Sequence, residues 1–596
     1  MPPPPPTSDD ILLKGYDPKV ARRLSAFIYP YRWKFTLALL LMLLTSASTV
    51  AGPYLVKVAL DAGLAAGSRA ALGKAVLLYL FVAGVQWVTI YFRVNLMAWV
   101  GQSIIFDLRA RLFEHLQSLS LSFYSRYSVG RVITRVINDV SVLREFITWA
   151  VLAIFRDLFA VVGIVIAMLS MNLRLSLLTF AVLPLMIAAT IFFRKRAREN
   201  YRLVRSAISW VNSVLAENIN GVRVVQAFSR EAINYAHFRD EVNQNNLTVN
   251  LRAARIASAF PAVIDLLGSL ATALAIWFGG AAVLGEQITA GVMVAFVLYI
   301  DRFFEPIRDL SQRYDSLQSA MAAGERIIQL LDASAEVTDF PDAQDIPPIR
   351  GEVQFAHVSF HYSDDGENNN SPVLEEIELH VLSGQTIALV CETGAGKSTL
   401  VKLLSRFHDP TEGRVLIDGR DLRQVTQNSL RRQMGIVLQD PFLFNGTVRE
   451  NIRFGRLEAD DAEVEAAAKA VGAHDFITRL RQGYDTSVEE GGLLLSVGQR
   501  QLISFARALL ADPRILILDE ATSSVDTQTE RIIQSAFARL LKDRTAFVIA
   551  HRISTVVNAD HIVVIHGGRI VEQGTHAELL AQGGQYYRLY SMGFEE

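Results

Sequence analysis

Apolar positions divide the chain into two unlike halves. Up to about residue 310, long apolar runs recur, whereas later apolar runs are short and alternate with polar helical segments. A helix rises about 1.5 Å per residue, so roughly 20 apolar residues cross the roughly 30 Å hydrocarbon core of a membrane. Six runs reach this length and predict membrane-spanning helices, near residues 34–56, 74–98, 147–171, 175–194, 258–283 and 288–308.

Two more polar stretches, residues 99–146 and 195–257, keep a helical period between the spans. They predict helices that continue from the membrane into the cytoplasm and return. Each stretch has one predicted break, Tyr127–Arg131 with Gly130 and Asn218–Val222 with Gly221, where we expect the chain to turn and return by way of a short crossing helix. Basic residues cluster around these stretches, so the positive-inside rule places them and both termini in the cytoplasm.

Composition limits the alternatives. The mean hydropathy is +0.26 and the apolar content 51%, which is high for a soluble protein, and the net charge of −2 does not indicate nucleic-acid binding. The one cysteine, Cys391, excludes an intrachain disulfide. We expect four regions, namely a disordered N-terminal tail at 1–17, a transmembrane domain at 18–331, a linker at 332–350 and a nucleotide-binding domain at 351–596.

Several charged residues fall at or near membrane depth. An unpaired charge there costs roughly 2.5–3.5 kcal/mol at a helix centre, so such groups usually face a cavity or a partner. Arg156 and Asp265 are the most interior, and both a buried structural pair and a role in a substrate cavity remain open for them. The set is Arg93, Arg156, Asp157, Asp265, Asp301, Arg302 and Glu305.

The second half of the chain contains a predicted phosphate-binding loop. The apolar run 387–390 predicts a buried strand, and Thr393–Thr399 follows it as a glycine-rich turn that enters a helix. Backbone amides of such a turn can surround phosphates, while Lys397 adds a positive charge and the Ser398 hydroxyl can bind Mg²⁺. The general pattern has glycine where this chain has Cys391, which puts the shape of that turn in question.

A second strand ends in two carboxylates. The apolar run 515–518 predicts a buried strand, and Asp519 and Glu520 follow it. Asp519 can hold Mg²⁺ through water, and Glu520 can orient and deprotonate the attacking water, as phosphoryl transfer requires. An acidic pair after a strand can also cap a helix, but the phosphate loop earlier in the chain favours the catalytic interpretation.

With these motifs, the chain resembles a half-subunit of the ABC transporters of the type IV exporter class. Residues 495–499, Leu-Ser-Val-Gly-Gln, are similar to the family signature, with Val497 in place of the commonest glycine. The resemblance covers nearly the whole chain. It implies an α-helical six-span membrane domain followed by an α/β P-loop ATPase domain, with ATP and Mg²⁺ as cofactors. It also implies a multi-pass protein of the cell membrane whose nucleotide-binding domain is cytoplasmic.

The resemblance further implies roles for single residues. Glu520 and His551 would be catalytic, with His551 contacting the γ-phosphate, and Tyr362 would stack on adenine. The nucleotide would be bound by Tyr362, Gly394, Gly396, Lys397, Ser398, Thr399, Gln439, Ser496, Gly498 and Gln499. The metal ligands would be Ser398, Gln439 and Asp519.

The mechanism of the resembled family implies that two such chains sandwich ATP head to tail. The chain would then be an ATP hydrolase that exports or flips amphipathic substrates, such as a drug, lipid or peptide, by alternating access. Its partners would be the lipid bilayer and a second half-transporter subunit, with a heterodimer favoured over a homodimer because Glu520 is present while Val497 alters the signature. An ATP-gated channel on the same scaffold, or a dedicated exporter of peptides or lipid-linked sugars, are the alternatives.

Overall fold

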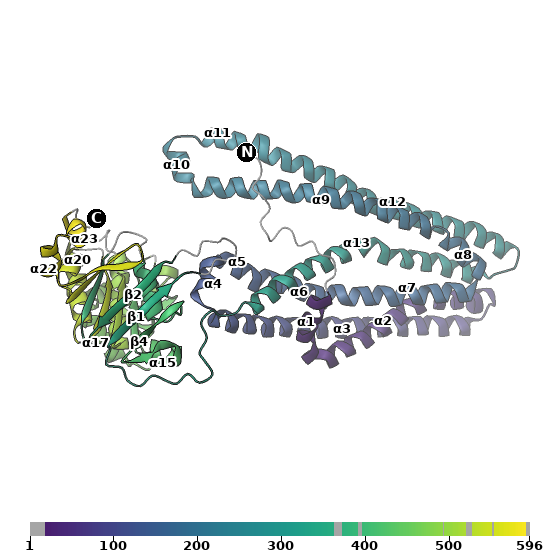
Figure 1. The fold of residues 1–596 in the computed structure, drawn as a ribbon. Helices are drawn as coiled ribbons and strands as arrows, with labels where there is room; N and C mark the ends of the chain where they lie inside the picture. The colour runs from purple at the N-terminus through teal and green to yellow at the C-terminus, as the bar shows by residue number, and fades with distance from the viewer. Residues whose placement is uncertain are drawn as a thin grey trace. The chain divides into compact units, whose positions relative to one another are not determined.

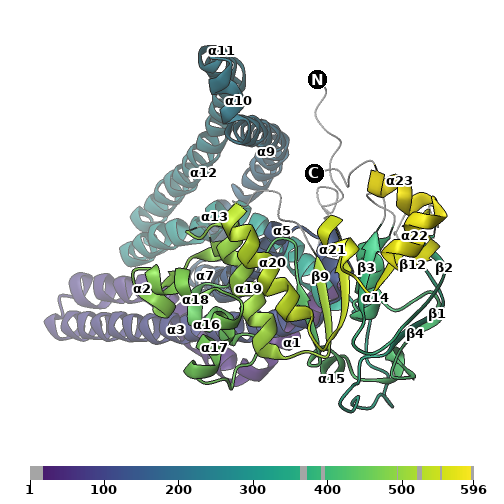
Figure 2. The ribbon, with the colours of Figure 1, turned by 90° about the vertical axis from the view of Figure 1, so that its left-hand side faces the viewer.

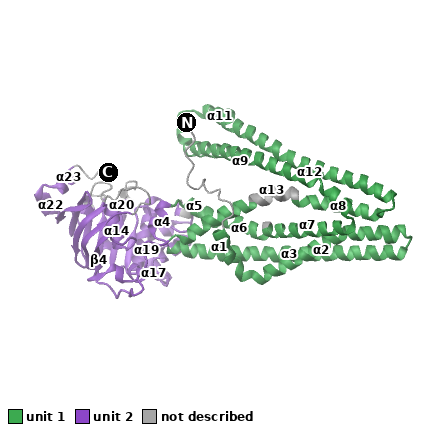
Figure 3. Ribbon diagram, turned by 45° about the vertical axis from the view of Figure 1, so that its right-hand side comes forward, with its two compact units in different colours: residues 1–118, 127–333 green, residues 119–126, 334–596 purple. Residues whose placement is uncertain are grey.

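The computed structural model describes residues 18–362, 372–390, 396–492, 494–519, 527–550 and 553–591. The chain divides into two compact units (Figure 3). Unit 1 comprises residues 1–118 and 127–333, and unit 2 comprises residues 119–126 and 334–596. The short segment 119–126 therefore belongs by its contacts to the second unit, although it lies inside the first along the chain.

Unit 1 is helical throughout its described residues (Figure 1). Five helical stretches are long and apolar enough to cross a membrane, namely Pro18–Ala65, Arg69–Ser118, Val129–Met171, Leu173–Asn220 and Glu231–Leu284. Its α-helices are α1 (Pro18–Ile28), α2 (Arg32–Val58), α3 (Arg69–Ser118), α5 (Val129–Thr134), α6 (Val140–Glu145), α7 (Val151–Met171), α8 (Leu173–Phe180), α9 (Leu183–Asn220), α10 (Val222–Ala227), α11 (Glu231–His237), α12 (Gln244–Leu284) and α13 (Ala290–Asp332).

The sixth predicted span, residues 288–308, falls in α13 but is not among these five. Its apolar run carries Asp301, Arg302 and Glu305, three charges within the length of one span. The prediction of six spans is therefore met only in part, as a helical transmembrane region with five spans identified by length and composition.

Two long helical arms leave the spans, as predicted. Helices α9 and α12 run side by side and diverge from α2, α3 and α7 (Figure 1). Gly221 ends α9 and begins the short helix α10, so the turn predicted there is confirmed. The break predicted over Tyr127–Arg131 is confirmed as well, because residues 127–128 separate the short helix α4 (Leu121–Arg126) from α5, although Gly130 itself lies inside α5.

The first arm also breaks at residues 119–120, after α3, so that α4 is a short helix between the two breaks. Serines mark both sides of α4. The hydroxyls of Ser120 and Ser122 lie 2.8 Å apart, and Ser128 adopts an extended backbone before α5. Serine hydroxyls compete with helical backbone hydrogen bonds, so these residues favour the breaks on both sides of α4.

A proline in α2 is complemented by polar side chains of α13. Pro53 lies inside α2 and has no backbone N–H, so it cannot donate to the Thr49 carbonyl four residues earlier. The Arg302 guanidinium donates to that Thr49 carbonyl, and the Tyr299 hydroxyl donates to the next carbonyl, of Val50, at 2.6 Å. The charge of Arg302 at membrane depth therefore has a backbone partner.

The start of α13 is fixed by a carboxylate from a π-helical segment, Ala59–Ala65. Asp61 accepts hydrogen bonds from the Thr289 hydroxyl at 2.6 Å and from the Gly291 N–H at 3.0 Å. Negative charge is favoured at a helix N-terminus, so this contact joins α13 to the end of α2.

Replacing Gly291 with alanine is expected to destabilise unit 1. The new Cβ would collide with the Asp61 carboxylate and lie 2.7 Å from the Lys57 carbonyl oxygen, so we expect a loss of about 1–3 kcal/mol. Thermal unfolding of the purified protein in nanodiscs measures the loss. Gly280→Ala in α12 is the matched control, because nothing lies within 4 Å of its added Cβ. Equal unfolding temperatures for both variants would contradict the expectation.

Unit 2 is built on two main sheets with helices (Figure 2). The six-stranded sheet has the order β12-β11-β3-β10-β9-β6, and the four-stranded antiparallel sheet the order β2-β1-β4-β5. A two-stranded sheet pairs β7 with β8. The strands are β1 (Val353–Phe360), β2 (Leu374–Val381), β3 (Thr386–Val390), β4 (Glu412–Ile417), β5 (Arg420–Asp421), β6 (Met434–Val437), β7 (Gly446–Thr447), β8 (Ser487–Val488), β9 (Ile515–Asp519), β10 (Thr545–Ile549), β11 (His561–His566) and β12 (Arg569–Gly574).

Helices of unit 2 complete the α/β domain predicted from the sequence. Helices α17, α19 and α20 lie on one side of the six-stranded sheet, and the antiparallel sheet lies on the other (Figure 2). Besides α4, the α-helices of unit 2 are α14 (Lys397–Leu404), α15 (Gln427–Arg431), α16 (Val448–Arg453), α17 (Asp461–Ala470), α18 (His474–Arg479), α19 (Val497–Ala511), α20 (Thr527–Leu541), α21 (Ile553–Val557), α22 (His576–Gln582) and α23 (Gln585–Ser591).

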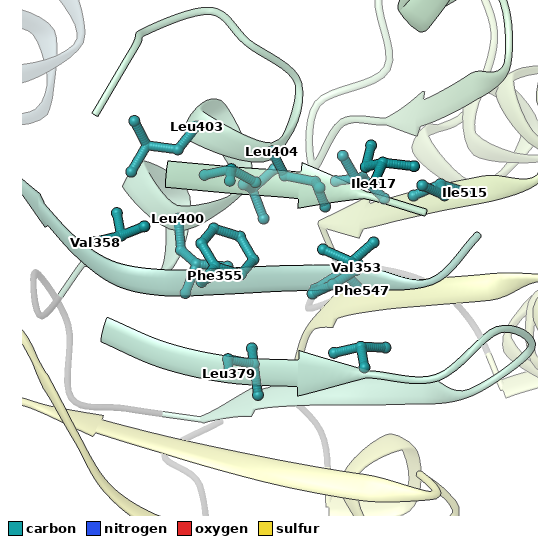
Figure 4. Close-up of a cluster of buried hydrophobic side chains, with 14 of the residues drawn as sticks. Val353, Phe355, Val358, Leu379, Leu400, Leu403, Leu404, Ile417, Ile515 and Phe547 are labelled. Carbon is teal, nitrogen blue, oxygen red and sulfur yellow. The ribbon is translucent and has the colours of Figure 1, made fainter. Parts of the chain in front are cut away.

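One buried core joins the two sheets and the helix after the phosphate loop (Figure 4). Phe355 of β1, Leu379 of β2, Leu400 of α14 and Phe547 of β10 each expose 2% or less of their surface within this cluster. Alternating buried and exposed positions along β1 and β2 match the period-two pattern of a sheet with one buried face. The core thus fixes α14 against both sheets.

Candidate functional site

Five of the described strands, β11, β3, β10, β9 and β6, run parallel and end at one edge of the six-stranded sheet. Strand β10 pairs in parallel with β3 and with β9, and β9 pairs in parallel with β6. In register, Ile549 lies opposite both Leu389 and Asp519. Carboxyl ends of parallel strands form the usual ligand-binding edge of such sheets. The segments that follow these strands therefore leave from neighbouring positions at one edge.

This edge gathers several residues that the sequence singled out. Lys397 begins the helix that follows β3, Asp519 ends β9, and Gln439 lies two residues after β6. Asp519 is half-buried and Gln439 is exposed. Glu520 and His551, which directly follow this edge in the sequence, lie outside the described residues, as do Cys391 and Gly394.

The described end of the phosphate loop requires glycine. Gly396 has a φ of +109° and caps α14, and a Cβ on it would lie 2.6 Å from Leu374 Cδ2. The first turn of α14 leaves Ser398 exposed and Lys397 half-buried, whereas Thr399 is buried. Helix amides, a lysine and a hydroxyl together suit a polyphosphate carrying Mg²⁺.

A metal ion at this edge would be held by few protein groups, together with a bound phosphate. Among the described residues, no group of three or more His, Cys, Asp or Glu side chains could hold a metal ion. Mg²⁺ commonly binds one or two protein oxygens together with substrate phosphates. The Ser398 hydroxyl and the Asp519 carboxylate at this edge are donors of that kind.

Tyr362 lies beside α14, in a cluster of rings. Its ring meets Phe360 and His408 edge-on, at centroid distances of 4.9 Å and 5.3 Å. Its hydroxyl lies 3.1 Å from the Thr399 hydroxyl, and 37% of the residue is exposed. The Lys402 ammonium lies 5.7 Å from the ring centroid. Tyr362, which we expected to stack on adenine, thus contacts α14, the helix that begins at Lys397.

The signature residues form a helix cap. Ser496 is the N-cap of α19, and its hydroxyl accepts a hydrogen bond from the Gln499 N–H at 3.3 Å. The Gln499 side chain returns the interaction by accepting from the Ser496 N–H at 3.0 Å. Ser496 is exposed, while Gly498 is buried. The spacing of serine and glutamine already carried this capping signal, which the sequence interpretation did not use.

Sequence reasoning also missed residues that surround Tyr362. His408 is only 5% exposed, but a single histidine between Phe407 and Asp409 has no spacing in the sequence that would mark it as buried. Glu336 lies in the predicted linker, and its carboxylate approaches His408. Neither contact is visible without the tertiary fold.

Unit 1 contains an apolar cavity of about 520 Å³ between α2, α7 and α13. Phe159 lies on its α7 wall, and the polar groups around it come from Ser46, Tyr54 and Tyr299. The remaining lining residues are Leu43, Ala47, Val50, Ala51, Val162, Gly163 and Ala167.

Arg156 lies close to this region, on α7. The Ser46 hydroxyl donates to the Arg156 carbonyl at 3.4 Å. The Arg156 guanidinium forms an ion pair of 2.7 Å with the adjacent Asp157. Arg156 therefore has an ionic partner on its own helix.

Known proteins resemble this chain over almost its full length. Residues 31–307 match the ABC transporter transmembrane region, and residues 374–523 match the ABC transporter family. The chain is 41% identical over 581 residues to the uncharacterized ABC transporter ATP-binding protein YknV of Bacillus subtilis, covering 97% of this chain and 95% of that protein.

Two further relatives have more specific names. The putative multidrug export ATP-binding/permease protein YgaD of Bacillus subtilis is 39% identical, with 96% of this chain and 99% of that protein covered. An ATP-dependent lipid A-core flippase of Syntrophus aciditrophicus is 38% identical, with 97% and 95% covered.

A solved structure agrees with the sequence relatives. A bacterial Atm1-family ABC exporter with ATP bound matches with a TM-score of 0.76 and 30% identity, over 94% of this chain and 98% of that one. The resemblance inferred from the motifs is confirmed. The chain therefore belongs to the ABC transporter family, as a membrane-spanning exporter half-transporter whose ABC ATPase domain lies in the cytoplasm.

Proposed function

We propose that the chain exports or flips amphipathic molecules across the cell membrane by alternating access, driven by ATP hydrolysis. The cavity between α2, α7 and α13 carries this proposal. Its volume of about 520 Å³ falls within the range of small-molecule sites, and its walls are apolar with a few hydroxyl groups. Relatives named as a putative multidrug exporter and a lipid A-core flippase support substrates of this kind.

In this proposal, α13 is the sixth membrane span. Its length of 43 residues is more than a crossing requires. A charge such as that of Arg302 is costly inside a membrane span unless it has a partner. The Arg302 guanidinium has one, because it donates a hydrogen bond to the Thr49 carbonyl of α2. The Tyr299 hydroxyl is satisfied in the same way by Val50.

We base the roles proposed for the nucleotide-site residues on their positions at the carboxyl ends of the parallel strands. Lys397 and the first turn of α14 would bind the β- and γ-phosphates, with Gly394, Gly396 and Thr399 shaping the loop. Bound Mg²⁺ would neutralise phosphate charge, held by Ser398, Asp519 and Gln439. Glu520 would take the proton of the attacking water, and His551 would contact the γ-phosphate.

The same proposal needs two chains. Each chain carries one phosphate loop and one signature, so Ser496, Gly498 and Gln499 of one half-transporter would face the phosphates bound by another. The N-terminus of α19, where Ser496 is exposed, suits an anion because of the helix dipole. We favour a heterodimer over a homodimer, because Val497 alters the signature while Glu520 is retained.

The test is ATPase activity and mass of this chain alone in lipid nanodiscs, followed by transport in vesicles. A dye-labelled short-chain phospholipid is the transport probe, and Lys397→Met is the control that should remove ATP-dependent movement. Activity of a pure dimer would establish a homodimer and overturn the heterodimer. Ion flux that persists without hydrolysis would overturn the export mechanism in favour of an ATP-gated channel.

A further inference from the structure

The short helix α4 is coloured with unit 2 in Figure 3, and Glu336 of the linker contacts both of its ends. Leu119 and Phe123 are buried, at 8% and 6% exposure. The Glu336 N–H donates to the Ser120 hydroxyl at 3.4 Å, and the Glu336 carboxylate pairs with the Arg126 guanidinium at 2.6 Å. Glu336 therefore holds both the beginning and the end of the segment 119–126.

The second oxygen of the same carboxylate faces a buried histidine. Glu336 Oε2 lies 3.8 Å from His408 Nδ1. Burial lowers the pKa of His408, with Lys402 acting in the same direction, against the carboxylates of Glu336 and Asp409, which raise it. The lowered pKa favours the neutral ring, which can pack against other rings without the cost of a buried charge.

His408 in turn supports Tyr362. The two rings meet at 90°, with their centroids 5.3 Å apart, and Phe360 contacts both of them. On its other side, Tyr362 is held by the Thr399 hydroxyl at 3.1 Å. Edge-to-face contacts of this kind fix the orientation of a ring as well as its position.

A buried arginine holds the linker against the segment that contains His408. Arg406 is only 1% exposed and donates to Asp339 Oδ1 at 3.0 Å and to the Thr338 carbonyl at 3.2 Å. Residues 336–339 of the linker thus run along the segment 405–409 that follows α14. The contact between Glu336 and His408 is therefore part of a packed strip rather than a chance approach of two side chains.

We propose that His408 is a positioning residue for the nucleotide base, which sets the orientation of Tyr362, and that Glu336 makes this orientation depend on α4. The proposal rests on the proposed role of Tyr362 in stacking on adenine. It adds a route by which a segment of the membrane-domain sequence, residues 119–126, affects recognition of the base without contacting the nucleotide.

The test compares a ligand that has the base with one that lacks it. Binding of the non-hydrolysable ATP analogue AMP-PNP and of inorganic tripolyphosphate, each with Mg²⁺, is measured by calorimetry on the full chain in nanodiscs. The dissociation constant for tripolyphosphate divided by that for AMP-PNP reports the contribution of the base alone, and a lower ratio means a weaker contribution. A change confined to the phosphate loop would weaken both ligands and leave this ratio unchanged.

Two substitutions at His408 separate its ring from its polar contact. His408→Gln removes the ring and should lower the affinity for AMP-PNP on the order of 10-fold, within the range of a lost base–aromatic contact, with tripolyphosphate unaffected. His408→Phe keeps the ring and should retain the affinity for AMP-PNP. Equal weakening of both ligands by His408→Gln would overturn the proposal.

The link to α4 is tested at an exposed position that should not disturb folding. Arg126→Met removes the ion pair with Glu336 and should lower the ratio about two- to threefold, as expected for a partly exposed ion pair. In the His408→Phe background, where the polar contact is already absent, Arg126→Met should have no further effect. An equal effect in both backgrounds would overturn the dependence on α4.

Tyr362→Ala distinguishes failure of this inference from failure of the proposed function. If Tyr362→Ala leaves the ratio unchanged, Tyr362 does not bind the base, and its proposed role fails together with the inference. If Tyr362→Ala lowers the ratio but His408→Gln does not, only the inference is overturned.

Discussion

Replacing Glu520 with glutamine is expected to lower ATP turnover on the order of 10²- to 10⁴-fold, while ATP still binds. Glutamine has nearly the shape of glutamate but cannot accept the proton of the attacking water. The contacts proposed between the phosphates and Lys397 and Ser398 do not involve this carboxylate, so the affinity for ATP should remain. Steady-state phosphate release and equilibrium binding of ATP, measured on the same nanodisc sample, separate the two effects.

Glu458→Gln is the matched control for this experiment. Glu458 is an exposed carboxylate of the same domain, away from the strand ends, and its substitution should leave turnover unchanged. Turnover of Glu520→Gln within threefold of the unsubstituted chain would remove Glu520 from the role of base. If binding is lost together with turnover, the substitution has instead disturbed the phosphate site.

Replacing Arg302 with methionine is expected to destabilise the membrane half by about 1.5–3 kcal/mol, the usual worth of a hydrogen bond to a charged group. Methionine fills a similar volume but cannot donate to the Thr49 carbonyl. Pro53 cannot donate to it either, so this buried carbonyl loses its partner. The unfolding temperature in nanodiscs, supported by denaturant titration, measures the loss.

The explanation through Pro53 can be tested by a double-mutant cycle. Pro53→Ala restores the N–H that an ordinary helix gives to the Thr49 carbonyl, so Arg302→Met should cost at least about 1 kcal/mol less in that background. Tyr299→Phe is the matched control, because the Val50 carbonyl keeps the N–H of Tyr54 as its helical donor. An additive cycle for Arg302 and Pro53 would show that the arginine acts through some other group.

The sequence predicted the site where its chemistry depends on local spacing. Gly396, Lys397 and Ser398 must follow a strand in that order, and the structure has the strand, the left-handed glycine and the helix. The parallel strand order that brings Asp519 to the same edge was not predictable from spacing alone, since it depends on β10 lying between β3 and β9. The catalytic roles of Glu520 and His551 stay predictions.

The membrane half shows where a linear pattern is insufficient. Composition excludes α13 from the apolar spans because of its charges, yet one of them is satisfied by a carbonyl 253 residues away in the chain. The break predicted over Tyr127–Arg131 falls at residues 127–128 rather than at Gly130, because flexibility of a glycine permits a turn without requiring one. The earlier break at residues 119–120 was not predicted, because the preference of serine for such positions is weaker than that of glycine.

Assignment of residues 119–126 to unit 2 has a consequence for the exchange of parts between related transporters. A chimaera that takes only residues 334–596 from a relative would pair a foreign linker with the native Ser120 and Arg126, and would lose the contacts that Glu336 makes with them. Natural recombination at a single crossover faces the same mismatch. A transferable ATPase module of this chain is therefore discontinuous, and a functional graft should carry the eight-residue segment 119–126 together with the C-terminal part.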